Sequence, residues 1–189
     1  MVEIAEMAEK AEKYKAGEVM IDQQEILERA KEIGRQITED FAGEEVLVVG
    51  ILKGAVMWLS DVVKNIDLDA RIDFMAVSSY GTSTETTGVV RIVKDLDASI
   101  ENKNVIVVED IVDSGVTLSY LKRYLRGRGA KSLKICALLD KPAGRKAEIE
   151  IDYVGFTVED KFIVGYGLDY NQQYRNLPYI SCLEYERRK

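Results

Sequence analysis

The segment from Val105 to Thr117 constrains the fold of this chain more than any other part of the sequence. It reads VIVVEDIVDSGVT. Its first four residues are all β-branched, which predicts a strand buried on both faces, as in a parallel sheet. Leucines at positions 118, 121 and 125 then follow a helical spacing. The segment therefore predicts a buried strand that leads through a short polar loop into a helix.

The loop 113–117 combines short polar side chains with a glycine. A junction of this kind presents backbone N–H groups and hydroxyls that can hold a phosphate. The adjacent carboxylates of Glu109 and Asp110 would repel a phosphate, so binding of sugar hydroxyls, directly or with Mg²⁺, suits them better. A second interpretation is a buried strand followed by an acidic turn in which Ser114 or Asp113 only caps the helix.

The rest of the chain alternates predicted strands with predicted helices. Asp22 and Glu25 have the spacing of a helix capping box, and Gly17 is expected to end the first helix. This alternation favours one α/β domain, in which helices flank a parallel sheet. We predict strands over 19–21, 46–52, 71–78, 89–93, 105–109, 131–139, 150–158 and 161–165, and helices over 2–16, 22–41, 55–63 and 117–126.

The composition excludes several classes of function. The chain has no histidine, which disfavours Ser-His and Cys-His hydrolases and leaves proton transfer to carboxylates, lysines or tyrosines. Cys136 and Cys182 lack a metal-binding spacing. The net charge of −7 opposes non-specific binding of nucleic acid. No apolar run approaches the roughly 20 residues of a membrane helix, and the N-terminus lacks the layout of a signal peptide. We expect a cytoplasmic protein with neither a membrane nor a nucleic acid as partner.

Two segments resemble motifs of one enzyme family. The stretch 105–117 is similar to the phosphoribosyl-pyrophosphate (PRPP) motif of the type I phosphoribosyltransferases. The stretch 158–170, VEDKFIVGYGLDY, resembles the base-binding segment of the 6-oxopurine branch, the hypoxanthine-guanine phosphoribosyltransferases. The resemblance extends over about residues 19–185. It implies a parallel sheet flanked by helices, with a small hood subdomain to which 158–189 contribute, in a single domain over 1–189. Residues 1–16 would form a helical extension.

The resemblance implies roles on the PRPP side of the site. Glu109 and Asp110 would meet the ribose hydroxyls together with Mg²⁺, and the loop 113–117 would hold the 5′-phosphate. A non-proline cis peptide bond is implied between Leu52 and Lys53, in a loop that faces pyrophosphate. The polar stretch 80–88 would form a mobile lid. The residues implied in binding substrates are Lys53, Gly54, Ser79, Tyr80, Glu109, Asp110, Asp113, Ser114, Gly115, Val116, Thr117, Lys141, Phe162, Ile163, Asp169 and Arg175.

On the base side, the resemblance implies that Phe162 stacks on the purine and that the backbone of Ile163 bonds its edge. Lys141 would contact the 6-oxo group, and Asp113 would accept the N7 proton as the catalytic base. Asp169 would bind a second Mg²⁺, and Arg175 would contact pyrophosphate. The implied reaction moves the phosphoribosyl group from PRPP to N9 of hypoxanthine or guanine, giving IMP or GMP and pyrophosphate. A homodimer or homotetramer is implied as well.

Other interpretations of the same residues remain open from the sequence. Lys53 and Lys141 suit solvated surface lysines, Phe162 suits the core, and Asp169 suits a turn. The stretch 80–88 suits an ordinary hairpin. A transferase for xanthine or a pyrimidine is a near alternative, and an RNA-binding regulator that keeps the fold is a more distant one. The negative charge weighs against the regulator. No Gly-x-Gly-x-x-Gly follows any strand, which disfavours a Rossmann oxidoreductase.

Overall fold

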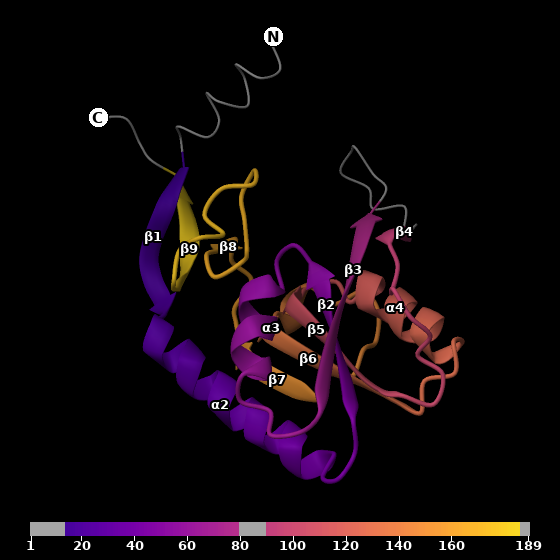
Figure 1. Ribbon diagram of the computed structural model, residues 1–189. Coiled ribbons are helices and arrows are strands. Elements are labelled where there is room, and N and C mark those ends of the chain that lie inside the picture. The colour runs from indigo at the N-terminus through magenta and orange to yellow at the C-terminus, as the bar shows by residue number, and fades with distance from the viewer. Residues whose placement is uncertain (1–13, 80–89, 186–189) are drawn as a thin grey trace.

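A six-stranded sheet forms the centre of the molecule (Figure 1). The computed structural model describes residues 14–79 and 90–185. All neighbouring strands of this sheet run parallel except β4, which pairs antiparallel with β3 at one edge. The α/β prediction is confirmed. In spatial order the strands are β4 (Val90–Lys94), β3 (Ala70–Ser79), β2 (Val46–Leu52), β5 (Asn104–Val112), β6 (Ser132–Asp140) and β7 (Tyr153–Thr157).

Helices cover both faces of the sheet. Helices α2 (Gln23–Asp40) and α3 (Val56–Val63) pack on one face, and α4 (Val116–Arg126) packs on the other. Side chains of β5 alternate between the two cores: Ile106 contacts the first and Val107 the second. The strand is therefore buried on both faces, as its β-branched composition predicts. None of the helices in the described part of the chain is long and apolar enough to cross a bilayer.

Helix α2 begins at the predicted capping box. Asp22 Oδ1 accepts a hydrogen bond of 2.9 Å from the backbone amide of Glu25, and Glu25 Oε2 accepts one of 2.9 Å from the amide of Asp22. Two amides of the first turn, which have no partner inside the helix, are satisfied in this way.

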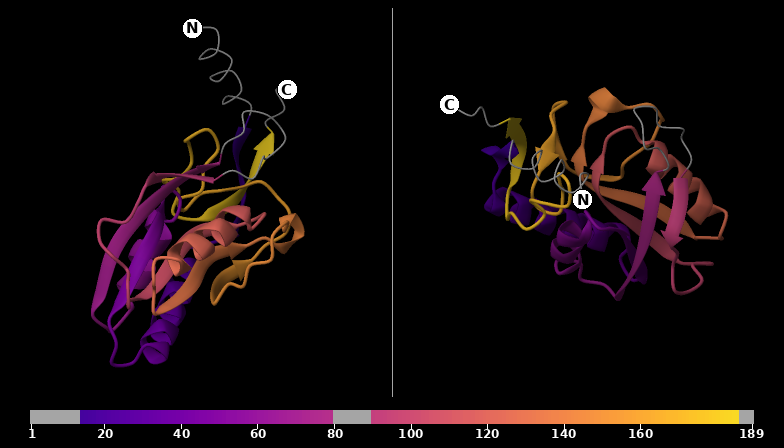
Figure 2. Two further views of the ribbon diagram at one scale, coloured as in Figure 1. Left: turned by 90° about the vertical axis from the view of Figure 1, so that its right-hand side faces the viewer. Right: turned by 90° about the horizontal axis from the view of Figure 1, so that it is seen from above.

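A second, smaller sheet lies beside the first (Figure 2). This hood sheet consists of β1 (Tyr14–Ile21), β9 (Ile180–Tyr185) and β8 (Ile163–Val164), in that order and all antiparallel. The prediction of a helix through residue 16 is wrong for residues 14–16, which belong to β1. Pairing with a strand about 170 residues away overrides the local helical spacing there. Residues 1–13 of the expected helix lie outside the described residues.

The remaining strand predictions differ from the structure mainly at their ends. The strands expected over 150–158 and 161–165 are confined to β7 and β8, and β9 was not predicted. Strand β5 runs to Val112 rather than ending at residue 109, because Ile111 and Val112 still pair with Leu139 and Asp140 of β6. The extra length places Asp110, as well as Glu109, inside the strand and brings the following loop to the carboxyl edge of the sheet.

Candidate active site

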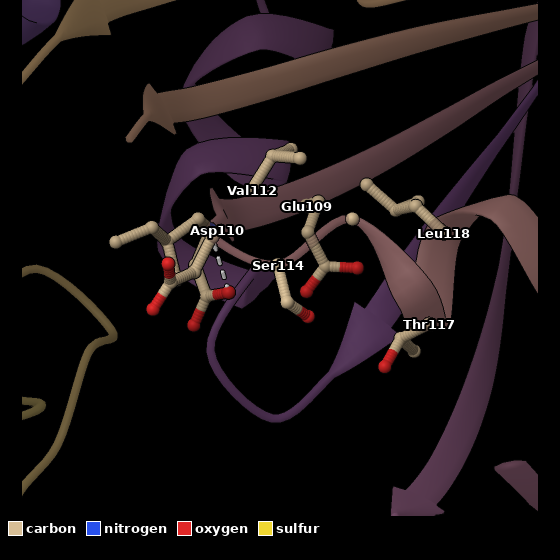
Figure 3. A pocket seen from close by; sticks show the side chains of 9 residues that line it. Glu109, Asp110, Val112, Ser114, Thr117 and Leu118 are labelled. Carbon is tan, nitrogen blue, oxygen red and sulfur yellow. Dashed lines mark hydrogen bonds between the residues drawn. The ribbon is translucent and has the colours of Figure 1, made fainter. Parts of the chain in front are cut away.

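Two pockets lie side by side at the carboxyl ends of β5 and β6, the edge at which open α/β sheets bind ligands. The first has a volume of about 220 Å³ and is formed by the end of β5 and the start of α4 (Figure 3). The second, of about 240 Å³, lies between β5, Lys141 and the segment 161–169. Asp110, Ile111 and Asp113 line both pockets. We call the first the phosphate pocket and the second the base pocket, after the ligands that the sequence resemblance implies for their residues.

The carboxylates of Glu109 and Asp110 lie side by side in the phosphate pocket (Figure 3). Burial, followed by the charge of Asp110, raises the pKa of Glu109 well above its ordinary value, and burial also raises the pKa of Asp110. Glu109 Oε2 is buried without a hydrogen-bond partner. Two buried, neighbouring carboxylates without enough hydrogen-bond donors fit a divalent cation or sugar hydroxyls. The cation would supply positive charge, and the hydroxyls would supply donors.

The donor set fits Mg²⁺ bound together with substrate rather than by protein alone. Within residues 14–79 and 90–185, no three His, Cys, Asp or Glu side chains gather closely enough to hold a metal ion. Mg²⁺ is commonly bound through one or two carboxylates, with phosphate oxygens and water completing its coordination. The predicted ligands that suit this pattern are Glu109 and Asp110 in the phosphate pocket and Asp169, which lines the base pocket together with Asp110.

The loop after β5 is held from behind by the segment that follows β6. The carbonyl oxygen of Ser114 accepts hydrogen bonds from the amides of Lys146 (2.9 Å) and Ala147 (3.0 Å). Gly115 has φ +76° and is the N-cap of α4, and a Cβ there would lie 2.7 Å from the carbonyl oxygen of Ala147. The N-cap residue of α4 is Gly115, so neither Asp113 nor Ser114 is the N-cap, although Ser114 Oγ accepts a hydrogen bond of 3.4 Å from the amide of Val116 in the first turn. The need for glycine comes from the turn and from this packing.

Strand β2 ends in the predicted pyrophosphate loop. The peptide bond between Leu52 and Lys53 is cis, as the resemblance implies. Gly54 then lies against two other segments of the site. A Cβ on Gly54 would overlap the carboxylate of Asp110, and a Cβ on Gly167 would overlap the carbonyl oxygen of Gly54. Gly54 therefore lies between the carboxylate of Asp110 and the backbone of Gly167, with no room for a side chain at either glycine.

Lys141 does not extend into solvent. Its ammonium lies 3.1 Å from Asp113 Oδ2 and 2.9 Å from Asp160 Oδ1, and only 12% of its side chain is exposed. Burial lowers the pKa of Lys141, but the hydrogen bonds to Asp160 and Asp113 outweigh it and leave the pKa above its ordinary value. The lysine stays charged and faces the base pocket. The interpretation of Lys141 as a solvated lysine is wrong.

Phe162 is 57% exposed, so the interpretation that places it in the core is also wrong. Its ring lines the base pocket and meets Tyr170 edge to face, with ring centroids 5.6 Å apart. The next residue, Ile163, is buried and pairs with Cys182 in the hood sheet. The backbone at these positions is fixed by that sheet, and the amide of Leu183 donates to the carbonyl oxygen of Phe162 over 2.8 Å. The hood sheet thereby holds an exposed aromatic face over the pocket.

Arg175 and Asp169 form an ion pair of 2.6 Å, and Arg175 also donates to the carbonyl oxygen of Gly167 over 2.6 Å. Asp169 Oδ2 accepts from the backbone amide of Gln172 over 2.8 Å. The side-chain oxygen of Gln172 accepts in turn from Lys53 Nζ over 3.3 Å. Lys53 is exposed but joined to this network, so both cations predicted to face pyrophosphate lie in one cluster with Asp169.

Several contacts of the site carry no signal in the sequence. Asp160 contacts Lys141, and Gln172 contacts Lys53, only because the fold brings separate segments together. The hydroxyl of Tyr166 donates to Asp61 of α3, and burial together with this bond raises the pKa of Tyr166 above its ordinary value. That bond ties the turn before Asp169 to the helix after the pyrophosphate loop. Lys141 and Asp160 are 19 positions apart, and the pairs Lys53–Gln172 and Asp61–Tyr166 are more than 100 positions apart.

Two of the predicted positions lie at the border of the described residues. Ser79 is the last residue of β3, and Tyr80 and the expected lid 80–88 lie outside the described residues. Val116 and Thr117 are in the first turn of α4, and Thr117 lines the phosphate pocket (Figure 3).

Comparison with known proteins identifies relatives over most of the chain. Residues 19–171 match the family model of the phosphoribosyl transferase domain. The chain is 51% identical to the hypoxanthine-guanine phosphoribosyltransferase of Bacillus subtilis, covering 91% of this chain and 96% of that protein. It is 54% identical to a bifunctional TilS/HprT protein of Listeria monocytogenes over 89% of this chain, but spans only 26% of that longer protein.

Solved structures agree with these matches. A crystal structure of a hypoxanthine phosphoribosyltransferase from Staphylococcus aureus superimposes with a TM-score of 0.87 at 51% identity, covering 89% of this chain and 92% of that one. A hypoxanthine-guanine phosphoribosyltransferase from Bacillus anthracis gives a TM-score of 0.85 at 46% identity, with 90% and 99% covered. From its sequence and its fold, the chain belongs to the phosphoribosyltransferase family, in the branch of the hypoxanthine-guanine phosphoribosyltransferases.

Proposed function

We propose that the protein transfers the 5-phosphoribosyl group of PRPP to N9 of hypoxanthine or guanine, releasing pyrophosphate and forming IMP or GMP. This is a purine-salvage reaction of a pentosyltransferase. One observation carries the proposal: the phosphate pocket and the base pocket share Asp110, Ile111 and Asp113 as a common wall. A sugar bound along that wall would have its phosphate in one pocket and its reacting carbon at the mouth of the other.

The base pocket has the groups that a 6-oxopurine needs. Phe162 offers an exposed ring for stacking, and the ammonium of Lys141 is a donor for the 6-oxygen. The carboxylate of Asp113 lines the pocket 3.1 Å from that ammonium. There Asp113 would accept the N7 proton while N9 attacks the sugar, and Lys141 would stabilise the charge that develops on the 6-oxygen.

Breaking the bond between C1 and pyrophosphate leaves positive charge on the ribose ring and negative charge on the leaving group. Lys53 and Arg175 lie in one hydrogen-bonded cluster at the end of the site and would neutralise the leaving pyrophosphate. Glu109 and Asp110 would orient the ribose hydroxyls. Mg²⁺, held by Glu109, Asp110 and Asp169 with substrate oxygens, would supply further positive charge when bound. We propose that the stretch 80–88, headed by Ser79 and Tyr80, closes over the substrates and excludes water.

The assembly and location of the protein stay predictions. We propose a homodimer or homotetramer in the cytoplasm, without nucleic acid or membrane as a partner, on the basis of the family resemblance and the charge of −7. We further propose that the chain forms a single domain over 1–189, with 158–189 contributing to the hood.

The test is release of pyrophosphate from PRPP in the presence of hypoxanthine, guanine, xanthine, adenine and uracil, each with and without Mg²⁺. We expect turnover with hypoxanthine or guanine only when Mg²⁺ is present. Turnover with xanthine or uracil alone would indicate another phosphoribosyltransferase. Tight, salt-sensitive binding of RNA without any turnover would show a regulator instead.

A further inference from the structure

The ammonium of Lys141 is the point at which three loops of the site meet. Lys141 follows β6, Asp113 follows β5, and Asp160 lies in the connection between β7 and β8. Both carboxylates bind the same Nζ atom, at 3.1 Å for Asp113 and 2.9 Å for Asp160. The proposed reaction gives Lys141 and Asp113 roles but uses Asp160 for nothing, although its carboxylate makes the shorter of the two contacts.

The carboxylates of Asp113 and Asp160 differ in packing and in exposure to solvent. Asp113 lines the base pocket, and its carboxylate is packed so closely against Gly144 that a Cβ on that glycine would overlap it. The side chain of Asp160 is 66% exposed, so Asp160 holds the ammonium while its other oxygen remains in water. A buried ammonium without a partner is costly. An anchor that stays hydrated satisfies Lys141 with little desolvation of its own.

We propose that Asp160 is a positioning residue that holds Lys141 against the 6-oxo group of the incoming base, an inference that rests on the function proposed above. When the purine binds, Asp113 exchanges its contact with Lys141 for the N7–H of the base. Asp160 retains the ammonium through this exchange and fixes its direction. The ammonium then donates to an oxygen at C6 but has no acceptor in the amino group of adenine, so Asp160 contributes to selection of 6-oxopurines.

The preceding residue supplies a matched control. Glu159 is also an exposed acid, but it pairs with Lys161 at 2.9 Å and does not contact Lys141. Replacing Glu159 by glutamine removes the same charge from the same loop without touching the ammonium. A difference between the two variants therefore isolates the contact from the net charge of the loop.

The experiment compares steady-state kinetics of the wild type with Asp160→Asn, Asp160→Glu and Glu159→Gln. In Asp160→Asn we expect the KM for hypoxanthine to rise about fivefold to tenfold, the KM for PRPP to stay unchanged, and the preference for hypoxanthine over adenine to fall. Asp160→Glu should recover part of the loss. Glu159→Gln should behave like the wild type.

A second measurement removes the 6-oxygen from the base instead of the carboxylate from the protein. Purine, which lacks that oxygen, should inhibit the wild type and Asp160→Asn with the same Ki. Equal losses for purine and hypoxanthine would show a structural role and overturn the inference, as would an Asp160→Asn variant that behaves like Glu159→Gln. A wild type without turnover on any oxopurine would overturn the proposed function as well, so the two failures are distinguishable.

Discussion

The Cα of Gly54 lies so close to the carboxylate of Asp110 that a single added carbon would overlap it. The same glycine has the backbone of Gly167 against its carbonyl oxygen. The pyrophosphate loop, the acidic end of β5 and the turn before Asp169 are therefore held at one spacing, and a change at Gly54 moves all three. This arrangement makes the glycine a sensitive point of the site although it has no side chain to do chemistry.

Gly54→Ala should lower kcat/KM for PRPP by about 100-fold, because a displacement of about 1 Å in a positioning loop costs that much. Steady-state kinetics with saturating hypoxanthine would measure it. Gly127→Ala is the matched control, since a Cβ there lies 3.5 Å from the carbonyl oxygen of Arg123, an ordinary contact. Equal activity of the two alanine variants would contradict the crowding at Gly54.

Asp113→Asn should reduce kcat about 10²- to 10⁴-fold if the carboxylate is the general base. The amide keeps the shape of the side chain but accepts no proton at neutral pH. Single-turnover measurements with hypoxanthine and PRPP would separate this step from product release. The control is Asp97→Asn, an exposed acid that pairs with Lys94 and lines neither pocket. Near-normal turnover of Asp113→Asn would contradict the assignment of Asp113 as the general base.

Phe162→Ala should raise the KM for the base about tenfold or more, since stacking of a base on an aromatic ring is worth about 1–3 kcal/mol. The KM for PRPP and the melting temperature should change little, because the ring is mostly exposed. Tyr185→Ala removes an equally exposed ring from the hood sheet, outside the base pocket. A matching loss of base affinity in that variant would point to the sheet rather than to stacking.

Glu109 should make the ligand-free protein less stable as the pH rises. Burial and the neighbouring Asp110 raise the pKa of Glu109 in the folded state, so above the pKa of the unfolded chain the folded state binds more protons. Stability is then lost as the pH rises through the folded pKa. Glu109→Gln should therefore raise the melting temperature at pH 7–8 by roughly 2–4 °C, while abolishing activity.

Calorimetry in EDTA from pH 5 to 8 would test this prediction. Glu44→Gln is the opposite control. Hydrogen bonds from Lys131 and Asn104 lower the pKa of Glu44, so that carboxylate stabilises the folded state at neutral pH and its removal should not raise the melting temperature. A Glu109→Gln protein that melts below the wild type at pH 8 would contradict the sign.

The central sheet could be predicted from the sequence because its strands are short apolar runs separated by helical spacing. The strand predicted over 105–109 and the capping box at Asp22 are local patterns, and the structure has both. The carboxyl end of β5 could not be placed, since only pairing of Ile111 and Val112 with β6 shows that the strand continues past the two acids. Local sequence does not report where a partner strand ends.

The hood sheet, in contrast, could not be predicted from local sequence. Tyr14 pairs with Tyr185, and neither residue carries a local pattern that indicates the other. The site itself divides in the same way. Phe162 and Lys141 were found through family motifs, whereas Asp160 and Gln172 enter only because separate loops meet in space. Tyr166 belongs to a recognised motif, but its bond to Asp61 depends on how α3 sits beside the hood.

The pairing of β1 with β9 also fixes the order in which the molecule can mature during translation. All six strands of the central sheet have been synthesised by residue 157, before any of β9 exists. Strand β1 is synthesised first but lacks its pairing partner β9 until residues 180–185 emerge from the ribosome. The strands of the central sheet, with Glu109 and Asp110, can thus be in place before residues 180–185 complete the hood sheet behind Phe162.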